Sequence, residues 1–296
     1  MIHIEKDVPL KNKTTFRIGG PARFYATIHS EDDIREALRW SQEKAVPVFM
    51  LGKGSNILIS DHGYPGLVVD LSRYDGIYWK GVIADCQAGA LVNALAREAV
   101  AGGLSGLEEL AGIPGSIGGA LIMNAGAFGQ TISDCLESVR GLHPATFSLV
   151  QLEKKQVTFG YRTSSLQSNA LFITGARFCF GESRKDLLQK TYNGILHKRN
   201  ENQPLDLPNC GSVFKRPAGY YAGALIEACG LKGYRIGRAI ISQKHANFIV
   251  NTGNATAEDV RALIAYAQEQ VYKHNGIMLE PEVIFVGNFS TPLFTA

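Results

Sequence analysis

Apolar residues recur at intervals of three and four in three segments of the chain, the spacing of a buried helix face. In residues 30–45 this face contains Ile34, Ala37 and Leu38, and Ser30 with Asp33 forms a capping-box pattern at the start. Helices are predicted over 30–45, 91–101 and 256–276, over a charged segment at 183–198 and, more briefly, over 223–229. Apolar runs predict strands at 46–51, 57–59, 147–152, 171–180, 247–250 and 283–286.

The predicted helices and strands interleave along the whole chain, and no repeat of fixed period is present. This order favours an α+β or α/β protein with two or three lobes. Residues 199–208, RNENQPLDLP, are polar and contain two prolines, which predicts a linker into a second unit. A length of 296 residues also suits about two domains.

Glycine is concentrated in two stretches between predicted elements. The chain has 32 glycines, and the two stretches are GKGSN at 52–56 and GIPGSIGGALIMNAGAFG at 112–129. Glycine permits positive φ and close approach to an anion, so the loops at 52–56 and 112–119 are candidates for binding a pyrophosphate through backbone N–H groups. Neither loop contains a Walker sequence or a complete GxGxxG fingerprint. Tight turns without a ligand are the alternative interpretation.

Composition argues against several classes of protein. Hydrophobic residues at 45% and charged residues at 19% describe a compact folded chain, and a net charge of +3 without runs of like charge does not indicate nucleic-acid binding. Five widely spaced cysteines without a CxxC pair argue against a disulfide framework and a zinc site, and favour a reducing cytosol. Because no apolar stretch suits a signal peptide or a membrane span, we expect a cytoplasmic protein that is not inserted in a membrane.

Polar residues with candidate chemistry are few and isolated. The seven histidines show no metal-binding spacing, and His245, which precedes a predicted strand, is better interpreted as structural. Arg162 in GYRTS, Ser212 in NCGSVFKRP and Glu282 in LEPEV have uncommon neighbours, although each residue type is ordinarily found at such places in turns or on surfaces. No GxSxG elbow surrounds Ser212, which argues against a serine hydrolase.

Seven segments, taken in order, resemble a single enzyme family. The chain is similar in them to the UDP-N-acetylenolpyruvoylglucosamine reductases, flavoenzymes of peptidoglycan precursor synthesis, and the match covers essentially the whole chain. The segments are TFRIGGPARF (15–24), LGKGSNILI (51–59), GIPGSIGGALIMNAGAFG (112–129), GYRTS (160–164), NCGSVFKRP (209–217), KHANFIVN (244–251) and LEPEV (279–283). The short spacing after GYRTS resembles type II members, which lack the loop that folds over the substrate in type I.

The resemblance implies an α+β fold with an FAD-binding region of the vanillyl-alcohol-oxidase (PCMH) type and a C-terminal substrate-binding domain. The FAD-binding region would span 1–198, with lobes at about 1–70 and 71–182 and a connecting helix. The substrate-binding domain would span 199–282, and the final strand, 283–296, would return to the first lobe.

The family reaction implied by the resemblance consists of two hydride transfers. NADPH reduces a noncovalently bound FAD, and hydride then passes to C3 of the enolpyruvyl ether of UDP-N-acetylglucosamine enolpyruvate, forming UDP-N-acetylmuramate. Negative charge develops at C2 and in the adjoining carboxylate. By resemblance, Arg162 stabilises the enolate oxygens, Ser212 donates a proton to C2, and Glu282 polarises the intermediate or assists the proton relay.

The resemblance also implies contacts with the cofactor and the substrate. The FAD pyrophosphate would meet the two glycine loops, and two further residues would lie near the flavin ring. The implied cofactor residues are Gly52, Lys53, Gly54, Ser55, Asn56, Gly115, Ser116, Gly118, Gly119, Asn124 and Ala125. The implied substrate residues are Tyr161, Lys215, Arg216 and Asn247, and no metal is implied.

Two other functions are weighed against this one. Another FAD oxidoreductase of the same fold, such as an alcohol oxidase, would not need Arg162, Ser212 and Glu282 together. A non-catalytic protein that binds a nucleotide sugar would not need them either. We expect a monomer, because no heptad pattern or long apolar edge stands out.

Overall fold

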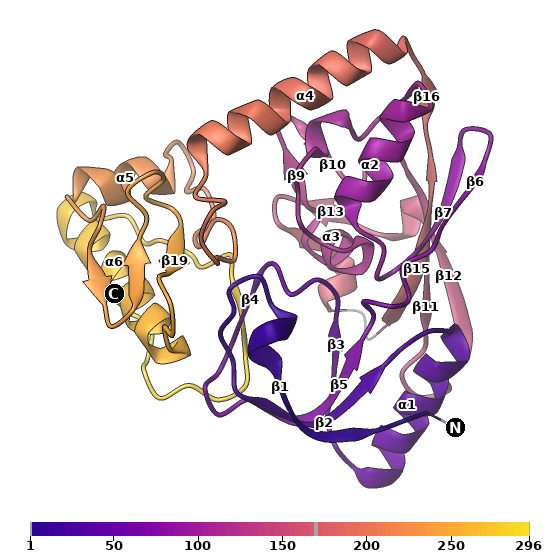
Figure 1. Ribbon diagram of the computed structural model, residues 1–296, viewed down its shortest axis with the longest axis horizontal. Helices are drawn as coiled ribbons and strands as arrows, with labels where there is room; N and C mark the ends of the chain where they lie inside the picture. Colours follow the sequence, from indigo (N-terminus) through magenta and orange to yellow (C-terminus); the bar gives the residue numbers. More distant parts are fainter. Residues whose placement is uncertain (1, 169–170, 296) are drawn as a thin grey trace. The chain divides into compact units, whose positions relative to one another are not determined.

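The computed structural model describes residues 2–168 and 171–295, and the chain divides into two compact units (Figure 1). Unit 1 consists of Met1–Glu5, Tyr25–Lys53 and Leu67–Arg199. Unit 2 consists of Lys6–Phe24, Gly54–Gly66 and Asn200–Ala296. Two N-terminal segments therefore group with the C-terminal part of the chain, and the expected functional boundaries at 198 and 282 stay a prediction.

Unit 1 contains a five-stranded antiparallel sheet. Its strand order is β12 (Leu149–Glu153), β11 (Leu136–Leu142), β15 (Phe172–Cys179), β7 (Ile83–Gln87) and β6 (Ile77–Lys80). The helix α3 (Ile117–Met123) packs against β15 and β7, two of the three interior strands. Predicted strands at 147–152 and 171–180 are confirmed as β12 and β15, whereas β6, β7 and β11 were not predicted.

Short elements connect the strands of this sheet. The predicted helix at 91–101 is confirmed as α2 (Val92–Ala101), and the glycine-rich stretch at 112–129 contains one short helix, α3, as its composition indicates. The remaining short strands pair in twos: β8 (Leu104–Ser105) with β16 (Gly181–Glu182), β9 (Gly126–Ala127) with β10 (Gln130–Thr131), and β13 (Phe159–Gly160) with β14 (Thr163–Ser164).

The helix α1 (Glu31–Lys44) begins and ends where its local sequence predicts. Ser30 Oγ accepts from Asp33 N at 3.2 Å, and the Asp33 carboxylate accepts from Ser30 N at 2.9 Å, which completes the capping box. Ala45 ends the helix in the left-handed region. A four-stranded sheet has the order β1 (Glu5–Pro9), β2 (Pro21–Thr27), β5 (Tyr64–Asp70) and β3 (Val48–Leu51).

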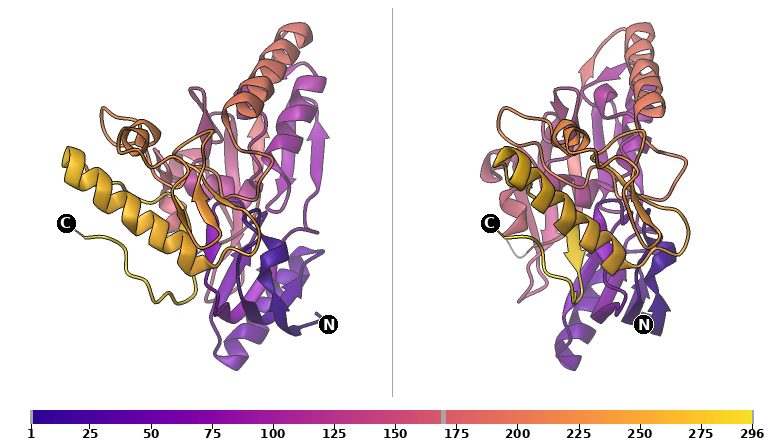
Figure 2. Two further views of the ribbon diagram at one scale, coloured as in Figure 1. Left: turned by 60° about the vertical axis from the view of Figure 1, so that its left-hand side comes forward. Right: turned by 90° about the vertical axis from the view of Figure 1, so that its left-hand side faces the viewer.

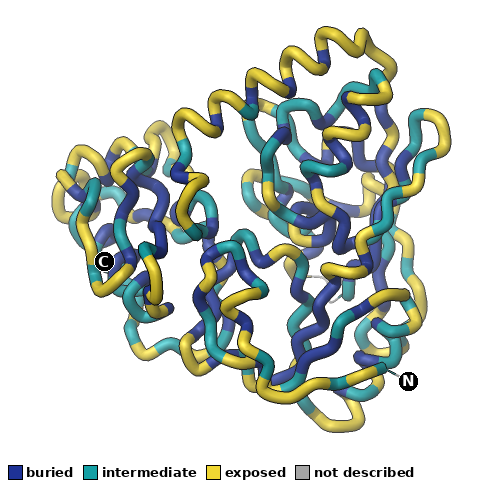
Figure 3. Tube along the Cα trace, in the orientation of Figure 1, coloured by how far each residue is buried: buried dark blue, intermediate teal, exposed yellow. Residues whose placement is uncertain are grey.

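The predicted linker begins later than expected. The helix α4 (Lys185–Asn202) continues through the first four residues of the 199–208 segment, so that part of the prediction is wrong. The reason is the buried stripe of α4, which passes from Leu188 through Tyr192 and Ile195 to Arg199 at helical spacing, although most of the helix is exposed (Figure 3). The helix ends shortly before Pro204, because a proline disfavours helical backbone in the residue before it.

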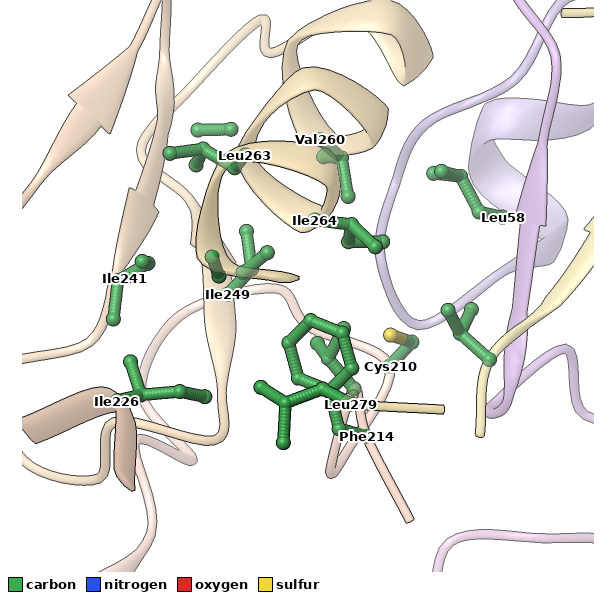
Figure 4. Packing of buried hydrophobic residues seen from close by; sticks show 14 of the residues in the cluster. Leu58, Cys210, Phe214, Ile226, Ile241, Ile249, Val260, Leu263, Ile264 and Leu279 are labelled. Atoms are coloured by element: carbon green, nitrogen blue, oxygen red, sulfur yellow. The ribbon is translucent and has the colours of Figure 1, made fainter. Parts of the chain in front are cut away.

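Unit 2 has its own hydrophobic core. A sheet of β17 (Arg235–Ile236), β18 (Ala239–Ile241) and β19 (Ile249–Asn251) packs against α6 (Ala257–Asn275), and α6 also contacts α5 (Ala222–Ala228). The core includes Leu58, Phe214, Ile264 and Leu279, so it joins the segment around residue 58 with the C-terminal part of the chain (Figure 4). The strand β20 (Ile284–Val286) pairs in parallel with β4 (Ile57–Ile59). These contacts hold the NCGSVFKRP and LEPEV segments in one core.

The helix α6 has the predicted caps, and the C-terminal segment runs back along it (Figure 2). Thr256 and Asp259 form the capping box, and Gly276 ends the helix with φ of 68°. Arg261 lies over the rings of Phe285 and Phe289, at 4.5 and 4.9 Å from their centroids.

Among the helices of the described residues, none combines the length and apolar character that a membrane span requires.

Candidate active site

Arg162 occupies a strained position at the tip of a tight hairpin. Gly160 of β13 pairs with Thr163 of β14, so Tyr161 and Arg162 form a two-residue turn between them. Arg162 has φ of 55°, a left-handed conformation that glycine adopts far more readily than arginine. Non-glycine residues in such conformations cost about 1–3 kcal/mol and concentrate at functional sites. The contacts of the hairpin must therefore offset the cost of this conformation at Arg162.

The hairpin is held against the end of α3 and the strand that follows. Arg162 Nη1 donates to Gly126 O at 3.0 Å, and Asn124 Nδ2 donates to Gly160 O at 3.0 Å. Asn124 itself has φ of 42° and ends α3. Its side chain is 7% exposed, and its Oδ1 accepts no hydrogen bond from the described residues. An unpaired buried acceptor costs about 1–3 kcal/mol, which makes Asn124 Oδ1 a candidate ligand contact.

The two predicted glycine loops meet at Gly52 and Ser116 in unit 1. A Cβ at Gly52 would overlap Ser116 Oγ and lie 3.0 Å from Ser116 Cβ, so a side chain at position 52 would force the Ser116 hydroxyl to move. Glycine at position 118 is explained by packing rather than by a ligand. A Cβ at Gly118 would lie 3.2 Å from the Cβ of Ala88, and the N–H of Gly118 already donates to Ala88 O at 2.9 Å. Gly118 thus serves helix packing. Gly115 O accepts from Val92 N at 3.0 Å, which ties the loop to α2.

Arg199 is a candidate that sequence reasoning missed, because the segment was assigned to a linker. It is 9% exposed, and Gly112 leaves room for it: a Cβ there would lie 3.0 Å from Arg199 Cδ. The Arg199 guanidinium carbon lies 5.7 Å from the ring centroid of Phe128. Burial lowers the pKa of Arg199, and the positive charge of Arg162 lowers it further. Two guanidinium groups of unit 1 therefore lie close enough to repel each other, as suits a site for an anion.

Ser212 and Glu282 belong to two segments that pair with each other in unit 2. Glu282 N donates to Val213 O at 2.7 Å, and Lys215 N donates to Glu280 O at 2.8 Å. Phe214, between them, forms a bridge with Pro281 and is buried in the core of Figure 4. Residues 65 to 69 positions apart in the sequence are thus fixed in register, so the backbone at Glu282 is set by the backbone next to Ser212.

Asn56 fixes the same segment from the glycine loop. Its Nδ2 donates to Glu282 O at 3.1 Å, and its own carbonyl accepts from Ile284 N at 3.0 Å. Gly54, with φ of 64°, would place a Cβ 2.7 Å from Lys13 O, so this part of the loop also requires glycine. The side-chain amide of Asn56 therefore binds the backbone of Glu282 directly, a role that the resemblance did not assign to Asn56.

The predicted substrate residues have different environments. Tyr161 is 56% exposed, and the guanidinium of Arg162 lies 5.2 Å from its ring centroid. Lys215 forms an ion pair with Glu280 at 2.5 Å, and Arg216 lies over the ring of Tyr221 at 3.9 Å. Asn247 differs from these residues, because both ends of its buried side-chain amide bind the backbone of Phe214.

The structure therefore collects the predicted residues into two groups, each within its own unit. Unit 1 holds Gly52, Lys53, Gly115, Ser116, Gly118, Gly119, Asn124, Ala125, Tyr161 and Arg162. Unit 2 holds Gly54, Ser55, Asn56, Ser212, Lys215, Arg216, Asn247 and Glu282. Among the residues that the structure describes, no group of three or more His, Cys, Asp or Glu side chains is arranged to hold a metal ion.

Known proteins resemble the chain along almost its whole length. A family model described as UDP-N-acetylenolpyruvoylglucosamine reductase, C-terminal domain, matches residues 203–286, and a model described as FAD binding domain matches residues 22–146. The UDP-N-acetylenolpyruvoylglucosamine reductase of Caldicellulosiruptor bescii is 45% identical, over 99% of this chain and 94% of the relative. The chain belongs to this reductase family.

A second relative and a solved structure agree with this assignment. The reductase of Synechococcus sp. (strain JA-3-3Ab) is 45% identical over 99% of this chain and 94% of its own length. The crystal structure of the Thermus caldophilus enzyme is 35% identical, covers 97% of this chain and all of that one, and superposes with a TM-score of 0.84. The expected fold is confirmed: an FAD-binding region of the PCMH type is followed by the C-terminal domain of the reductase family.

Proposed function

We infer that this chain catalyses the NADPH-dependent reduction of UDP-N-acetylglucosamine enolpyruvate to UDP-N-acetylmuramate, a step in peptidoglycan precursor synthesis. The inference rests on one observation above all: full-length relatives with this activity in their names are 45% identical across both the FAD-binding and the C-terminal parts. The enzyme is an FAD-dependent oxidoreductase, and its substrates are the enolpyruvyl nucleotide sugar and a nicotinamide cofactor.

The residues of unit 1 fit a bound FAD. Gly52 leaves space beside Ser116 that a side chain would fill, which suits close approach of the backbone to a pyrophosphate. Asn124 Oδ1 is a buried acceptor suited to an N–H group of the flavin ring. When bound, FAD supplies hydride exchange between NADPH and C3 of the enolpyruvyl group. We assign binding of the pyrophosphate to Gly52, Ser116 and their neighbours, and we assign to Gly118 the packing of α3.

Reduction at C3 leaves negative charge at C2 and in the adjoining carboxylate, and the catalytic residues must meet that charge. Arg162 is assigned to the carboxylate, because a guanidinium can donate two parallel hydrogen bonds to its oxygens. The positive charge of Arg199 adds to that of Arg162 in unit 1. Ser212 is assigned as the donor of the proton to C2, and Glu282, whose backbone pairs with the segment of Ser212, is assigned to the proton relay.

Substrate recognition is assigned to Lys215 and Arg216 of unit 2 and to Tyr161 of unit 1. Lys215 and Arg216 suit the two phosphates of UDP, and Tyr161 presents an exposed ring to the sugar or the nucleotide. Lys215 must exchange its ion pair with Glu280 for a phosphate, a small cost because Glu280 is 68% exposed. The proposal includes a monomeric enzyme located in the cytoplasm.

The decisive test separates the reaction into two half-reactions under anaerobic conditions. In the NADPH half-reaction, the visible flavin absorbance is expected to bleach. In the substrate half-reaction, UDP-N-acetylglucosamine enolpyruvate is expected to restore it, with UDP-N-acetylmuramate as the product detected by mass spectrometry. An alcohol oxidase of the same fold would recover its absorbance only with oxygen, and a binding protein would not turn over. Absence of anaerobic recovery overturns the proposed function.

The substitution Gly52→Ala is expected to weaken FAD binding by about ten- to hundredfold, because the added Cβ displaces Ser116 Oγ and fills the space through which the backbone would approach the pyrophosphate. The measurement is the flavin content of the purified protein, with FAD titration of the apoprotein by fluorescence. Gly194→Ala is the control, because a Cβ at Gly194 in α4 meets no atom of the described residues within 4 Å. Full flavin content in Gly52→Ala would contradict the assignment.

A further inference from the structure

Asn247 binds the backbone that immediately follows Ser212. Its Oδ1 accepts from Phe214 N at 3.0 Å, and its Nδ2 donates to Phe214 O at 2.9 Å. Its main-chain carbonyl also accepts from Val213 N at 2.8 Å. The orientation of the amide is fixed, because a backbone N–H only donates and a carbonyl only accepts. Asn247 therefore pairs with residues 213 and 214 as a neighbouring strand would.

The side chain of Asn247 is committed to this pairing. It is 8% exposed, so its amide lies inside unit 2 rather than on the surface where a nucleotide sugar binds. Its own N–H donates to His245 Nδ1 at 3.1 Å, which requires a neutral imidazole at that position. Burial, followed by the charge of Lys232, lowers the pKa of His245, which favours the neutral form that accepts this hydrogen bond, whereas a backbone hydrogen bond and Glu227 act in the opposite direction.

The segment around Ser212 is also held by hydrogen bonds to residues other than Asn247. Val213 O accepts from Glu282 N at 2.7 Å, so residues 213 and 214 lie between Asn247 and the LEPEV segment. On the other side of Ser212, Gly211 has φ of 79°, and its N–H donates to Asn209 Oδ1 at 2.9 Å. The backbone is thus fixed on both sides of Ser212, and the remaining freedom of its hydroxyl is rotation about χ1.

We propose that Asn247 is a positioning residue for Ser212, holding the hydroxyl where it can protonate C2, and that it is not itself a substrate contact. The inference rests on the proposed role of Ser212 as proton donor. A serine hydroxyl is a weak acid and protonates carbon only at hydrogen-bond distance, so small displacements matter. Misplacement of a reacting group by about 1 Å can lower a rate about 100-fold.

The test compares Asn247→Asp with the wild type in the two half-reactions. Aspartate keeps the acceptor for Phe214 N but replaces the donor to Phe214 O with a second oxygen, which repels that carbonyl. We expect the substrate half-reaction to slow by about ten- to hundredfold at saturating substrate, while the NADPH half-reaction and the Kd of the substrate change by less than about twofold. A raised Kd with an unchanged saturated rate would show a substrate contact and overturn the proposal.

Asn251→Asp is the matched control. Asn251 is also buried in unit 2, at 4% exposure, and its Nδ2 donates to Phe16 O at 3.1 Å, while its Oδ1 accepts from Gly253 N and Ala255 N. The control carries the same chemical change at a backbone clamp outside the Ser212 segment. It is expected to lower the Tm without changing the ratio of the two half-reaction rates. If Asn247→Asp does not fold, Asn247→Ala, which adds no charge, replaces it in the same comparison.

The double variant Ser212→Ala/Asn247→Asp tests whether Asn247 acts through Ser212. Once the hydroxyl is absent, its position no longer matters, so the second substitution is expected to slow the substrate half-reaction by less than about twofold further. If the double variant instead slows the substrate half-reaction by the product of the two single effects, the two residues act independently and the proposal is overturned. If Ser212→Ala slows the substrate half-reaction while Asn247→Asp leaves it at the wild-type rate, only the positioning role of Asn247 is overturned. A normal substrate half-reaction in Ser212→Ala overturns the role of Ser212 and with it this inference.

Discussion

Replacing Ser212 by alanine is expected to leave the NADPH half-reaction within about twofold of the wild type and to slow the substrate half-reaction by about 10²–10⁴-fold, the range of general acid catalysis. Only the second half-reaction delivers a proton to C2. Ser212 directly precedes Val213, whose backbone is fixed by Asn247 and Glu282, so alanine removes the proton donor without moving the segment. Stopped-flow absorbance of the flavin measures each half-reaction directly.

The control for this prediction is Ser41→Ala, which removes a buried hydroxyl that donates to Val46 O at 2.8 Å in unit 1. That loss is expected to lower the free energy of unfolding by about 1 kcal/mol and to leave both half-reactions unchanged. If Ser212→Ala slows both half-reactions equally, the serine is structural. If neither slows, another group protonates C2.

Replacing Arg162 by glycine is expected to separate stability from activity. Glycine adopts φ of 55° without strain, which offsets the loss of the hydrogen bond to Gly126 O, so the free energy of unfolding should stay within about 1 kcal/mol of the wild type. The substrate half-reaction should slow by about 10²–10³-fold, because a charged donor to the developing enolate is lost. Thermal unfolding and single-turnover kinetics measure the two effects.

Arg162→Lys is the matched variant for this prediction. It keeps the positive charge and the left-handed backbone but loses the planar fork that binds both oxygens of a carboxylate. We expect its substrate half-reaction to lie between those of the wild type and Arg162→Gly, with a Tm no higher than that of the glycine variant. A glycine variant with full activity would show that the strained backbone at 162 has no catalytic purpose.

Several features of this protein could be predicted from the sequence because they depend on neighbouring residues. The capping boxes of α1 and α6 are formed by side chains three positions apart, and both occur as predicted. The amphipathic spacing that identified α6 also names residues of its buried face, including Val260, Leu263 and Ile264. Family membership followed from short segments whose order and residue types are themselves properties of the sequence.

Features that depend on distant residues were not predicted. Arg199 was assigned to a linker by its polar neighbours, but the buried stripe of α4 extends to it and places it near Arg162. Asn247 was assigned to the substrate by resemblance, whereas its side-chain amide binds Phe214, 33 positions away. No local pattern distinguishes a buried asparagine that clamps a backbone from an exposed one that binds a ligand.

The sequence alone determined the interleaving of helices and strands, the capped helices, the glycine loops and the family, since each is recorded in residue type and short-range spacing; the α+β class followed from the resemblance to the family. Only the tertiary structure decided that Asn56 holds Glu282 across 226 positions, and that Glu282 pairs with Val213, a residue of the core of unit 2. The physical reason is that every residue offers the same backbone N–H and C=O groups, so residue type does not indicate which backbone a side chain will bind. Their partners are selected when the apolar side chains of separate segments, such as Phe214 and Leu279, are buried together.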